Sequence, residues 1–211
     1  KHKKEILKEI ARIIDSGIFL EGKENNLLAK NMRSYLQGGY VATVASGHDA
    51  ILIALQSLNL KRDDEVIFPV NAYPTAFAVA LSQATVVPLD VDKNGQLDIA
   101  LLQKKITKKT KAVILVHLYG LTTNIDEVKK ICKRYNITLI EDCAQAFGTT
   151  YKNRPVGTFG DISCFSFYPT KNLATLGDGG ALYTPYKKFY KFFLQAKSYG
   201  EKKRYESNFV S

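Results

Sequence analysis

The chain has 211 residues, 45% of them hydrophobic and 24% charged, and its 30 Lys and Arg against 20 Asp and Glu give a formal net charge of +10. These proportions are ordinary for a globular protein, and no apolar run approaches the ~18 residues of a membrane-spanning helix, so no membrane partner is expected. The positive charge favours anionic ligands, whereas a nucleic-acid partner is not expected, because the basic residues are not interleaved with aromatic residues in a known binding motif.

Short apolar runs alternate with amphipathic segments along the whole chain. Helices are expected over residues 3–14, 24–36, 49–58, 74–82, 98–105, 124–135 and 186–197. Strands are expected over residues 40–44, 66–68, 85–89, 112–116, 137–140, 162–167 and 181–183. Several of these strands are apolar throughout, which is typical of a parallel sheet covered on both faces. The pattern predicts one α/β domain with three layers, α/β/α, around a mostly parallel sheet of about seven strands.

The cysteines and the N-terminal residues limit the cellular locations in which the protein is expected. Cys132, Cys143 and Cys164 are odd in number and no spacing fits a zinc site, so no metal site is expected. Cys143 and Cys164 lie on or beside apolar runs and are expected to be buried thiols, which fits a reducing, cytoplasmic location. The N-terminal residues lack a signal peptide's apolar core, and the absence of a starting Met indicates an excerpt of a longer protein.

Three polar or small residues fall at the ends of apolar runs: Gly47, Asp142 and Ser166. Ligands of such sheets bind beyond the carboxyl ends of the strands, so these residues are expected to converge on one pocket. Lys171 follows Ser166 in a turn. A lysine amine for a Schiff base, a carboxylate for the ring nitrogen and a hydroxyl for the phosphate are the groups that pyridoxal 5'-phosphate (PLP) requires. The alternatives are a surface lysine at position 171 and a helix N-cap at position 142.

Three sequence blocks carry a resemblance to a known family: residues 141–148 (EDCAQAFG), 157–161 (GTFGD) and 166–173 (SFYPTKNL). In their order and spacing the chain resembles the sugar aminotransferases of the DegT/DnrJ/EryC1/StrS family, which are PLP enzymes of the aspartate aminotransferase-like fold type I. The resemblance covers essentially all 211 residues. It implies that residues 1–211 form the large PLP-binding domain with an N-terminal helical segment, and that the family's small C-terminal domain is absent from this chain.

The resemblance implies catalytic roles for two residues. Lys171 matches the lysine that binds PLP and later moves a proton, and Asp142 matches the acid that pairs with the pyridine nitrogen. Gln145 matches a glutamine that contacts the ring hydroxyl, and one helical turn would bring it to the same side as Asp142. His117, at the end of a strand, is either a residue of the active-site mouth or a satisfied structural histidine.

Further cofactor contacts are implied around the phosphate and the ring. Gly47 and His48 match the positions whose backbone amides hold the phosphate at a helix start, and Ser166 matches a serine that binds it from the other side. His48 replaces the family's usual threonine, so a hydroxyl contact is not expected there. Tyr73 matches an aromatic residue that stacks on the ring, with a core aromatic as the alternative. Tyr168 is a candidate contact for the sugar.

The activity implied by the resemblance is PLP-dependent transfer of an amino group. The donor would be L-glutamate or L-glutamine, and the acceptor a keto sugar of a nucleotide-linked deoxysugar in amino-sugar biosynthesis. Residues 203–209 resemble the loop that reaches into the neighbouring subunit, and the resemblance implies that the full-length protein is a homodimer with shared active sites. Three alternatives stay open: a non-catalytic PLP- or sugar-nucleotide-binding module, a dehydratase of the same family, and a basic nucleic-acid-binding domain. Lys171 disfavours the dehydratase, because a histidine replaces that lysine in the related dehydratases.

Overall fold

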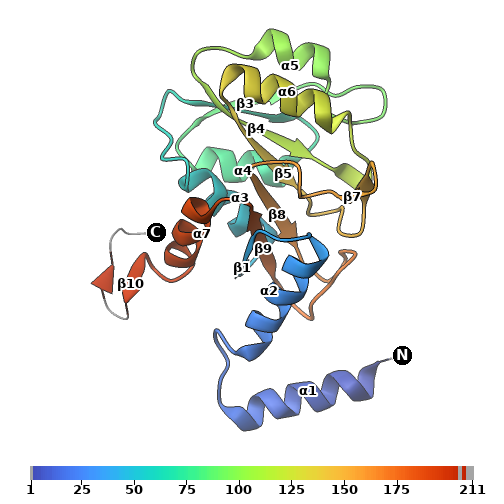
Figure 1. The fold of residues 1–211 in the computed structure, drawn as a ribbon, viewed down its shortest axis with the longest axis vertical. Helices are drawn as coiled ribbons and strands as arrows, with labels where there is room; N and C mark the ends of the chain where they lie inside the picture. Colours follow the sequence, from blue (N-terminus) through green and yellow to red (C-terminus); the bar gives the residue numbers. More distant parts are fainter. Residues whose placement is uncertain (1, 204–205, 208–211) are drawn as a thin grey trace.

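A seven-stranded sheet runs through the middle of the molecule, with helices on both faces (Figure 1). The computed structural model describes residues 2–203 and 206–207. The strand order is β1-β9-β8-β5-β4-β2-β3, and within it only β9 runs against its neighbours. The strands are β1 (Tyr40–Val44), β2 (Glu65–Pro69), β3 (Thr85–Leu89), β4 (Thr110–Val116), β5 (Thr138–Asp142), β8 (Ile162–Ser166) and β9 (Gly180–Thr184). The expected mostly parallel sheet is confirmed.

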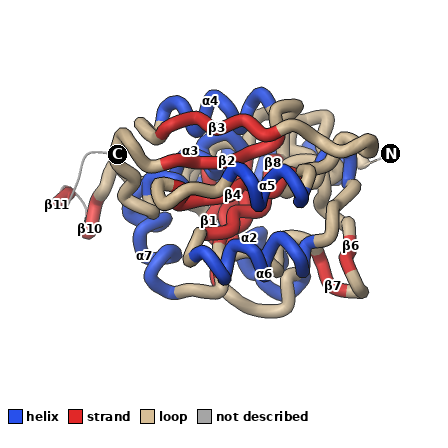
Figure 2. The backbone as a smooth tube through the Cα atoms, turned by 90° about the horizontal axis from the view of Figure 1, so that it is seen from above, coloured by secondary structure: helices blue, strands red, loops and turns tan. Residues whose placement is uncertain are grey.

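Apart from the N-terminal helix, the helices form two outer layers, one on each face of the sheet. Figure 2 shows helix 73–81 above the red strands and helix 125–135 below them. One layer holds α2 (Lys23–Tyr35), α5 (Ile99–Lys105) and α6 (Ile125–Tyr135). The other holds α3 (Gly47–Gln56), α4 (Tyr73–Leu81) and α7 (Lys187–Ala196). Successive side chains of a strand point to opposite faces, so Ile67 joins the first apolar cluster while Val66 and Phe68 join the second. Two cores therefore sandwich the sheet.

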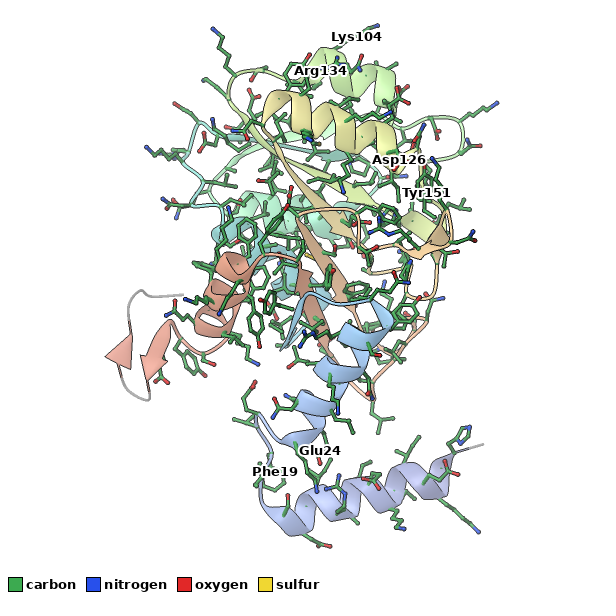
Figure 3. The ribbon with its side chains drawn as sticks, in the orientation of Figure 1. Phe19, Glu24, Lys104, Asp126, Arg134 and Tyr151 are labelled. Atoms are coloured by element: carbon green, nitrogen blue, oxygen red, sulfur yellow. The ribbon has the colours of Figure 1, made fainter. Side chains whose placement is uncertain are left out.

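The N-terminal helix α1 (Lys3–Ser16) stands apart from the sheet and buries none of its residues (Figure 1). Arg12 of α1 donates a hydrogen bond to Glu24 of α2 at 2.7 Å and ties the two helices together. Figure 3 shows Glu24 and Phe19 beside the junction, where Phe19 lies exposed. This end of the molecule thus carries uncovered apolar side chains and takes no part in the sheet.

The expected elements are present, with modest shifts in their bounds. Helix α3 begins two residues earlier than expected, because Ser46 Oγ accepts a hydrogen bond from Asp49 N at 3.0 Å and caps the helix there. Asp98 caps α5, as predicted, by accepting from Ala100 N and Leu101 N. Asn124 caps α6, also as predicted. Polar caps at known spacing were thus reliable markers of helix starts.

Short elements complete the described part of the chain. They are η1 (Leu118–Gly120), β6 (Thr150–Tyr151), β7 (Arg154–Pro155), β10 (Glu201–Lys203) and β11 (Glu206–Ser207). The predicted intersubunit loop at 203–209 falls largely outside the described residues and stays a prediction. No helix within the described ranges has the length and apolar content that a membrane crossing would require.

Candidate active site

A cavity of about 570 Å³ opens at the carboxyl ends of the central strands. Its walls include every residue that the sequence analysis singled out for PLP or sugar binding: Gly47, His48, Tyr73, Asp142, Gln145, Ser166, Tyr168 and Lys171. These residues come from segments as far apart as the start of α3 and the loop after β8. The expected convergence of strand ends on one pocket is confirmed.

Asp142 is the buried carboxylate of this cavity. It ends β5, is 5% exposed, and accepts hydrogen bonds from Thr75 Oγ1 at 2.9 Å and from Ala144 N at 3.0 Å. Burial raises the pKa of Asp142, and the two hydrogen bonds and the charges of His117 and Lys171 offset that rise only in part. The carboxylate is therefore short of positive charge and would gain from a cationic ligand.

The alternative of a helix N-cap at Asp142 is wrong. Residues 144–145 and 147–148 lie in turns, and no residue from 143 to 149 is helical. The inference that one helical turn brings Gln145 to the side of Asp142 is wrong for the same reason. Both side chains still line the cavity, because the turn folds back over the strand end: Ala146 N donates to Cys143 O at 3.0 Å.

Lys171 lies in a turn on the cavity wall. Its N–H donates to Tyr168 O at 2.8 Å, which closes the turn. Thr175 orders the loop beyond it by donating from N to Phe167 O at 2.8 Å. The ammonium acts on Asp142 through its charge. An amine and a buried acid thus share one cavity, which is the arrangement that imine chemistry with proton transfer requires.

The part of the cavity wall formed by the start of α3 and by Ser166 suits a phosphate. Ser46 caps α3 by accepting a hydrogen bond from Asp49 N. The first two N–H groups of the helix, those of Gly47 and His48, have no intrahelical acceptor and are free to bind an anion. Ser166 lies against Gly47 so closely that a Cβ on Gly47 would stand 2.5 Å from Ser166 Cβ. Only glycine fits there, and the serine hydroxyl and the helix start therefore face the same space.

A family model decides the identity of the chain. The model described as the DegT/DnrJ/EryC1/StrS aminotransferase family matches residues 1–211. The chain belongs to this family. The resemblance inferred from the three sequence blocks is thereby confirmed.

Curated relatives of this aminotransferase-family chain carry names of sugar enzymes. It is 36% identical over 198 residues to the dTDP-3-amino-3,4,6-trideoxy-alpha-D-glucose transaminase of Streptomyces venezuelae, covering 93% of this chain and 52% of the relative. It is 40% identical over 182 residues to a UDP-N-acetyl-3-dehydro-alpha-D-glucosamine 3-aminotransferase of Acidithiobacillus ferrooxidans, covering 85% of this chain and 49% of the relative. The chain thus spans about half the length of these relatives.

Solved structures agree on the fold. DesV of S. venezuelae, determined in complex with a ketimine intermediate, has a TM-score of 0.95 and 34% identity, covering all of this chain and 57% of DesV. NtdA of Bacillus subtilis, determined with its cofactor PMP bound, has a TM-score of 0.93 and 30% identity, covering 99% of this chain and 48% of NtdA. The three-layer, aminotransferase-like architecture expected from the sequence is confirmed.

Several residues that line this cavity were not predicted from the sequence. Thr75 is the clearest, because its hydroxyl bonds Asp142 across 67 positions of sequence and nothing local marks it. Tyr119 reaches Gln145 through its backbone N–H at 3.1 Å and adopts a left-handed conformation with φ 56°. Asp178 also lines the cavity. The glycines around Asp178 could have drawn attention to that loop, whereas Thr75 and Tyr119 required the fold.

One group in the described part of the chain has the spacing of metal ligands: His117, Glu141 and Cys143, whose ligand atoms lie within 4.8 Å of one another. Glu141 Oε2 already accepts from Gly157 N and contacts His117 Nε2, and Glu141 Oε1 accepts from two further backbone N–H groups. All acceptor positions of the carboxylate are thus used by the protein itself. The group is therefore structural.

Proposed function

We propose that the protein transfers an amino group from L-glutamate or L-glutamine to a keto sugar carried on a nucleotide, with PLP as cofactor. The observation that carries this proposal is the pairing of a charge-poor, buried Asp142 with Lys171 in one cavity. The family and the sugar transaminases among its relatives support the same activity.

The residues present fit PLP on three counts. The cavity of about 570 Å³ has the size of a cofactor site. Asp142, whose pKa is raised by burial, would gain a counter-charge from a pyridinium. Gly47, His48 and Ser166 offer N–H and O–H donors to a phosphate in the same cavity.

When bound, PLP supplies an electron-withdrawing ring that stabilises the negative charge left when the substrate's α-proton is removed. Asp142 would hold the ring nitrogen protonated, and Thr75 would orient that carboxylate through its hydrogen bond. Lys171 would bind the cofactor aldehyde and then carry the proton between carbon atoms, for which its amine must be neutral. Tyr73, at the start of α4, would cover one face of the ring and exclude water.

The substrate side is supported by charge and by the exposed rim. A nucleotide-linked sugar is an anion, and the net charge of +10 favours its approach. Tyr168 is half exposed at the cavity wall and would meet the sugar. We assign residues 1–211 to the large cofactor-binding domain, and a cytoplasmic location is supported by the three free, buried cysteines.

A homodimer is part of the same proposal. Helix α4 carries three exposed apolar side chains at four-residue spacing, Tyr73, Phe77 and Leu81. The row starts at the cavity, since Tyr73 lines it, so a second copy packed on α4 would also close the cavity mouth. Replacing Leu81 by Glu should shift the full-length protein toward monomer in sedimentation velocity, whereas Leu194→Glu on α7 should leave the dimer intact.

The proposed reaction is tested by the visible absorption spectrum of the protein with PLP, before and after L-glutamate. We expect a band that depends on Lys171 and that gives way to the spectrum of the aminated cofactor. Lys171→Ala should abolish the band, and Lys104→Ala, an exposed lysine on α5, should keep it. Binding of PLP without a lysine-dependent band, in both this chain and a version extended past Ser211, would instead favour a non-catalytic binding module.

A further inference from the structure

A turn with an unusual backbone forms part of the cavity wall. It is η1 (Leu118–Gly120), which follows β4. Its central residue, Tyr119, has φ 56° and ψ 23°, a left-handed conformation that costs a non-glycine residue roughly 1 kcal/mol. The Tyr119 side chain is 80% exposed, so its own packing does not hold that conformation. The surrounding hydrogen bonds must therefore hold it.

His117 is the residue that anchors this turn. Its backbone N–H donates to Asp142 O at 3.0 Å, and its carbonyl accepts from Gly120 N at 3.2 Å. Its ring is fully buried, with Nε2 lying 3.0 Å from Glu141 Oε2. Within the described residues the other ring nitrogen, Nδ1, has no hydrogen-bond partner. The bond to Glu141 is thus the one polar contact that fixes the ring, and His117 does not lie at the active-site mouth.

Glu141 is in turn fixed by backbone groups. It accepts from Gly157 N at 2.8 Å, Phe159 N at 2.7 Å and Gly160 N at 2.6 Å. These short bonds to a charged acceptor hold the carboxylate in one place. The sequence block at 157–161 served above only as a marker of the family. In the structure its backbone N–H groups fix Glu141, and through Glu141 they fix the ring of His117.

The turn ends at Gln145. Tyr119 N donates to Gln145 Oε1 at 3.1 Å. A backbone N–H can only donate, so the amide oxygen of Gln145 must face it, and Gln145 Nε2 is left as a donor. Gln145 and Lys171 both line the cavity, so that donor is available to a ligand there.

We propose that His117 is a positioning residue that makes Gln145 a hydrogen-bond donor to the bound cofactor. Glu141 fixes the imidazole of His117 through its hydrogen bond to Nε2. The fixed His117 in turn places the backbone of the turn, through its own N–H and C=O bonds. Tyr119 N then donates to the amide oxygen of Gln145. The acceptor on the ligand is the oxygen of the hydroxyl group on the PLP ring, so this inference rests on the proposed function. Without His117, Gln145 would be free to turn over and present its oxygen, which repels another acceptor.

The first experiment compares dissociation constants of the full-length protein for PLP and for 3-deoxypyridoxal phosphate, which lacks the ring oxygen. We expect the wild type to prefer PLP by about tenfold, the effect of one hydrogen bond to a charged acceptor. His117→Leu should reduce that preference to twofold or less. His117→Gln should retain it, because the glutamine Nε2 reaches as far as the histidine Nε2. An unchanged preference in His117→Leu would overturn the proposal.

Gln145→Glu tests the orientation itself. A glutamate can accept from Tyr119 N but cannot donate to the cofactor, so it should lose the preference while the fold is kept. A Gln145→Glu variant that still prefers PLP would contradict the assignment of Nε2 as the donor. If His117→Leu does not fold, His117→Asn replaces it, because its shorter amide cannot reach Glu141.

A ligand-free readout separates this inference from the proposed function. Hydrogen exchange at the Tyr119 amide, followed by NMR, should speed up in His117→Leu and stay slow in His117→Gln, while the Ala144 amide stays slow in both. Equal exchange at Tyr119 in all three proteins would overturn the role of His117. Failure of the wild type to bind PLP would instead refute the proposed function and leave the exchange result valid.

Discussion

Two neighbouring carboxylates, Glu141 and Asp142, point to opposite sides of the same strand, and their pKa values shift in opposite directions. Burial raises the pKa of both groups, but at Glu141 the hydrogen bond and charge of His117, with the N–H groups of Gly160 and Gly157, turn the net shift downward. Asp142 has two donors, and its pKa stays raised. The comparison shows that the protein supplies enough hydrogen-bond donors to stabilise the charge of Glu141 but too few to stabilise that of Asp142. Asp142 is the acid that faces the cavity.

The largest effect should come from Glu141→Gln. An amide brings an N–H donor into a site where three backbone N–H groups and His117 Nε2 already converge, so at least two donors must face each other. We expect a loss of about 3 kcal/mol in the free energy of unfolding, measured by urea denaturation. Glu127→Gln, exposed on α6, is the control and should change little.

The pH dependence of the same experiment sharpens the comparison. Because the pKa of Glu141 is lowered in the fold, its stabilisation is present above the unfolded pKa near 4.5 and is lost as pH falls through the folded value. The difference between wild type and Glu141→Gln should therefore shrink in acid. A difference that is constant from neutral pH down to the acid transition would contradict an ionised Glu141.

Asp142→Asn should act in the opposite direction on the ligand-free protein. A raised pKa means that ionised Asp142 costs stability, so the variant should be more stable than the wild type by about 1 kcal/mol at neutral pH. An amide also suits the site, since its oxygen can accept from Ala144 N and its nitrogen can donate to Thr75 Oγ1. The variant should lose PLP affinity, because it cannot balance a pyridinium.

The sign of the pH effect at Asp142 follows from linkage. The folded protein keeps the proton to higher pH than the unfolded chain, so stability falls as pH rises from the unfolded value near 3.8 through the folded pKa. Asp142→Asn should remove that fall. Urea denaturation of both proteins at several pH values above 4 measures it, and parallel pH profiles would refute the raised pKa.

Thr75→Val should weaken the support of Asp142 by a smaller amount. It removes one of the two hydrogen bonds that the carboxylate accepts, so the pKa of Asp142 should rise further. We expect a loss of roughly 1 kcal/mol in stability when Asp142 is ionised, and a smaller loss when it is protonated. Thr75→Ser keeps the hydroxyl and should behave like the wild type. Equal effects of Val and Ser would assign the loss to packing.

The smallest effect is expected at the cysteines, which are buried without strong donors. Burial raises the pKa of Cys132 to about 12, so at pH 8 only about one thiol in ten thousand is ionised. Burial also raises the pKa values of Cys143 and Cys164 well above the usual value for a thiol. A thiol reagent such as DTNB should react with none of the three until the protein unfolds. Fast reaction of one thiol in native buffer would show local opening.

The sequence predicted much of this site because its signals are local. Apolar runs that end at Asp142 and Ser166 placed both residues at strand ends, and the block around Lys171 identified the family. Helix caps at Asp98 and Asn124 were read correctly for the same reason, since capping spacing is a property of consecutive residues. The turn after Asp142 was read as helical because its composition does not distinguish a tight turn from a first helical turn.

By itself the sequence determined the order of helices and strands, the family, and which strand ends line the cavity, because periodicity and motifs depend on neighbours along the chain. Only the tertiary structure decided which carboxylate is satisfied. Glu141 and Asp142 are adjacent and equally acidic in the sequence, yet their donors come from His117, Thr75 and the 157–160 turn, which the fold alone brings to one side of β5 or the other. A pKa depends on those spatial neighbours. The sequence therefore located the candidate acid, and the fold explains why its pKa is raised.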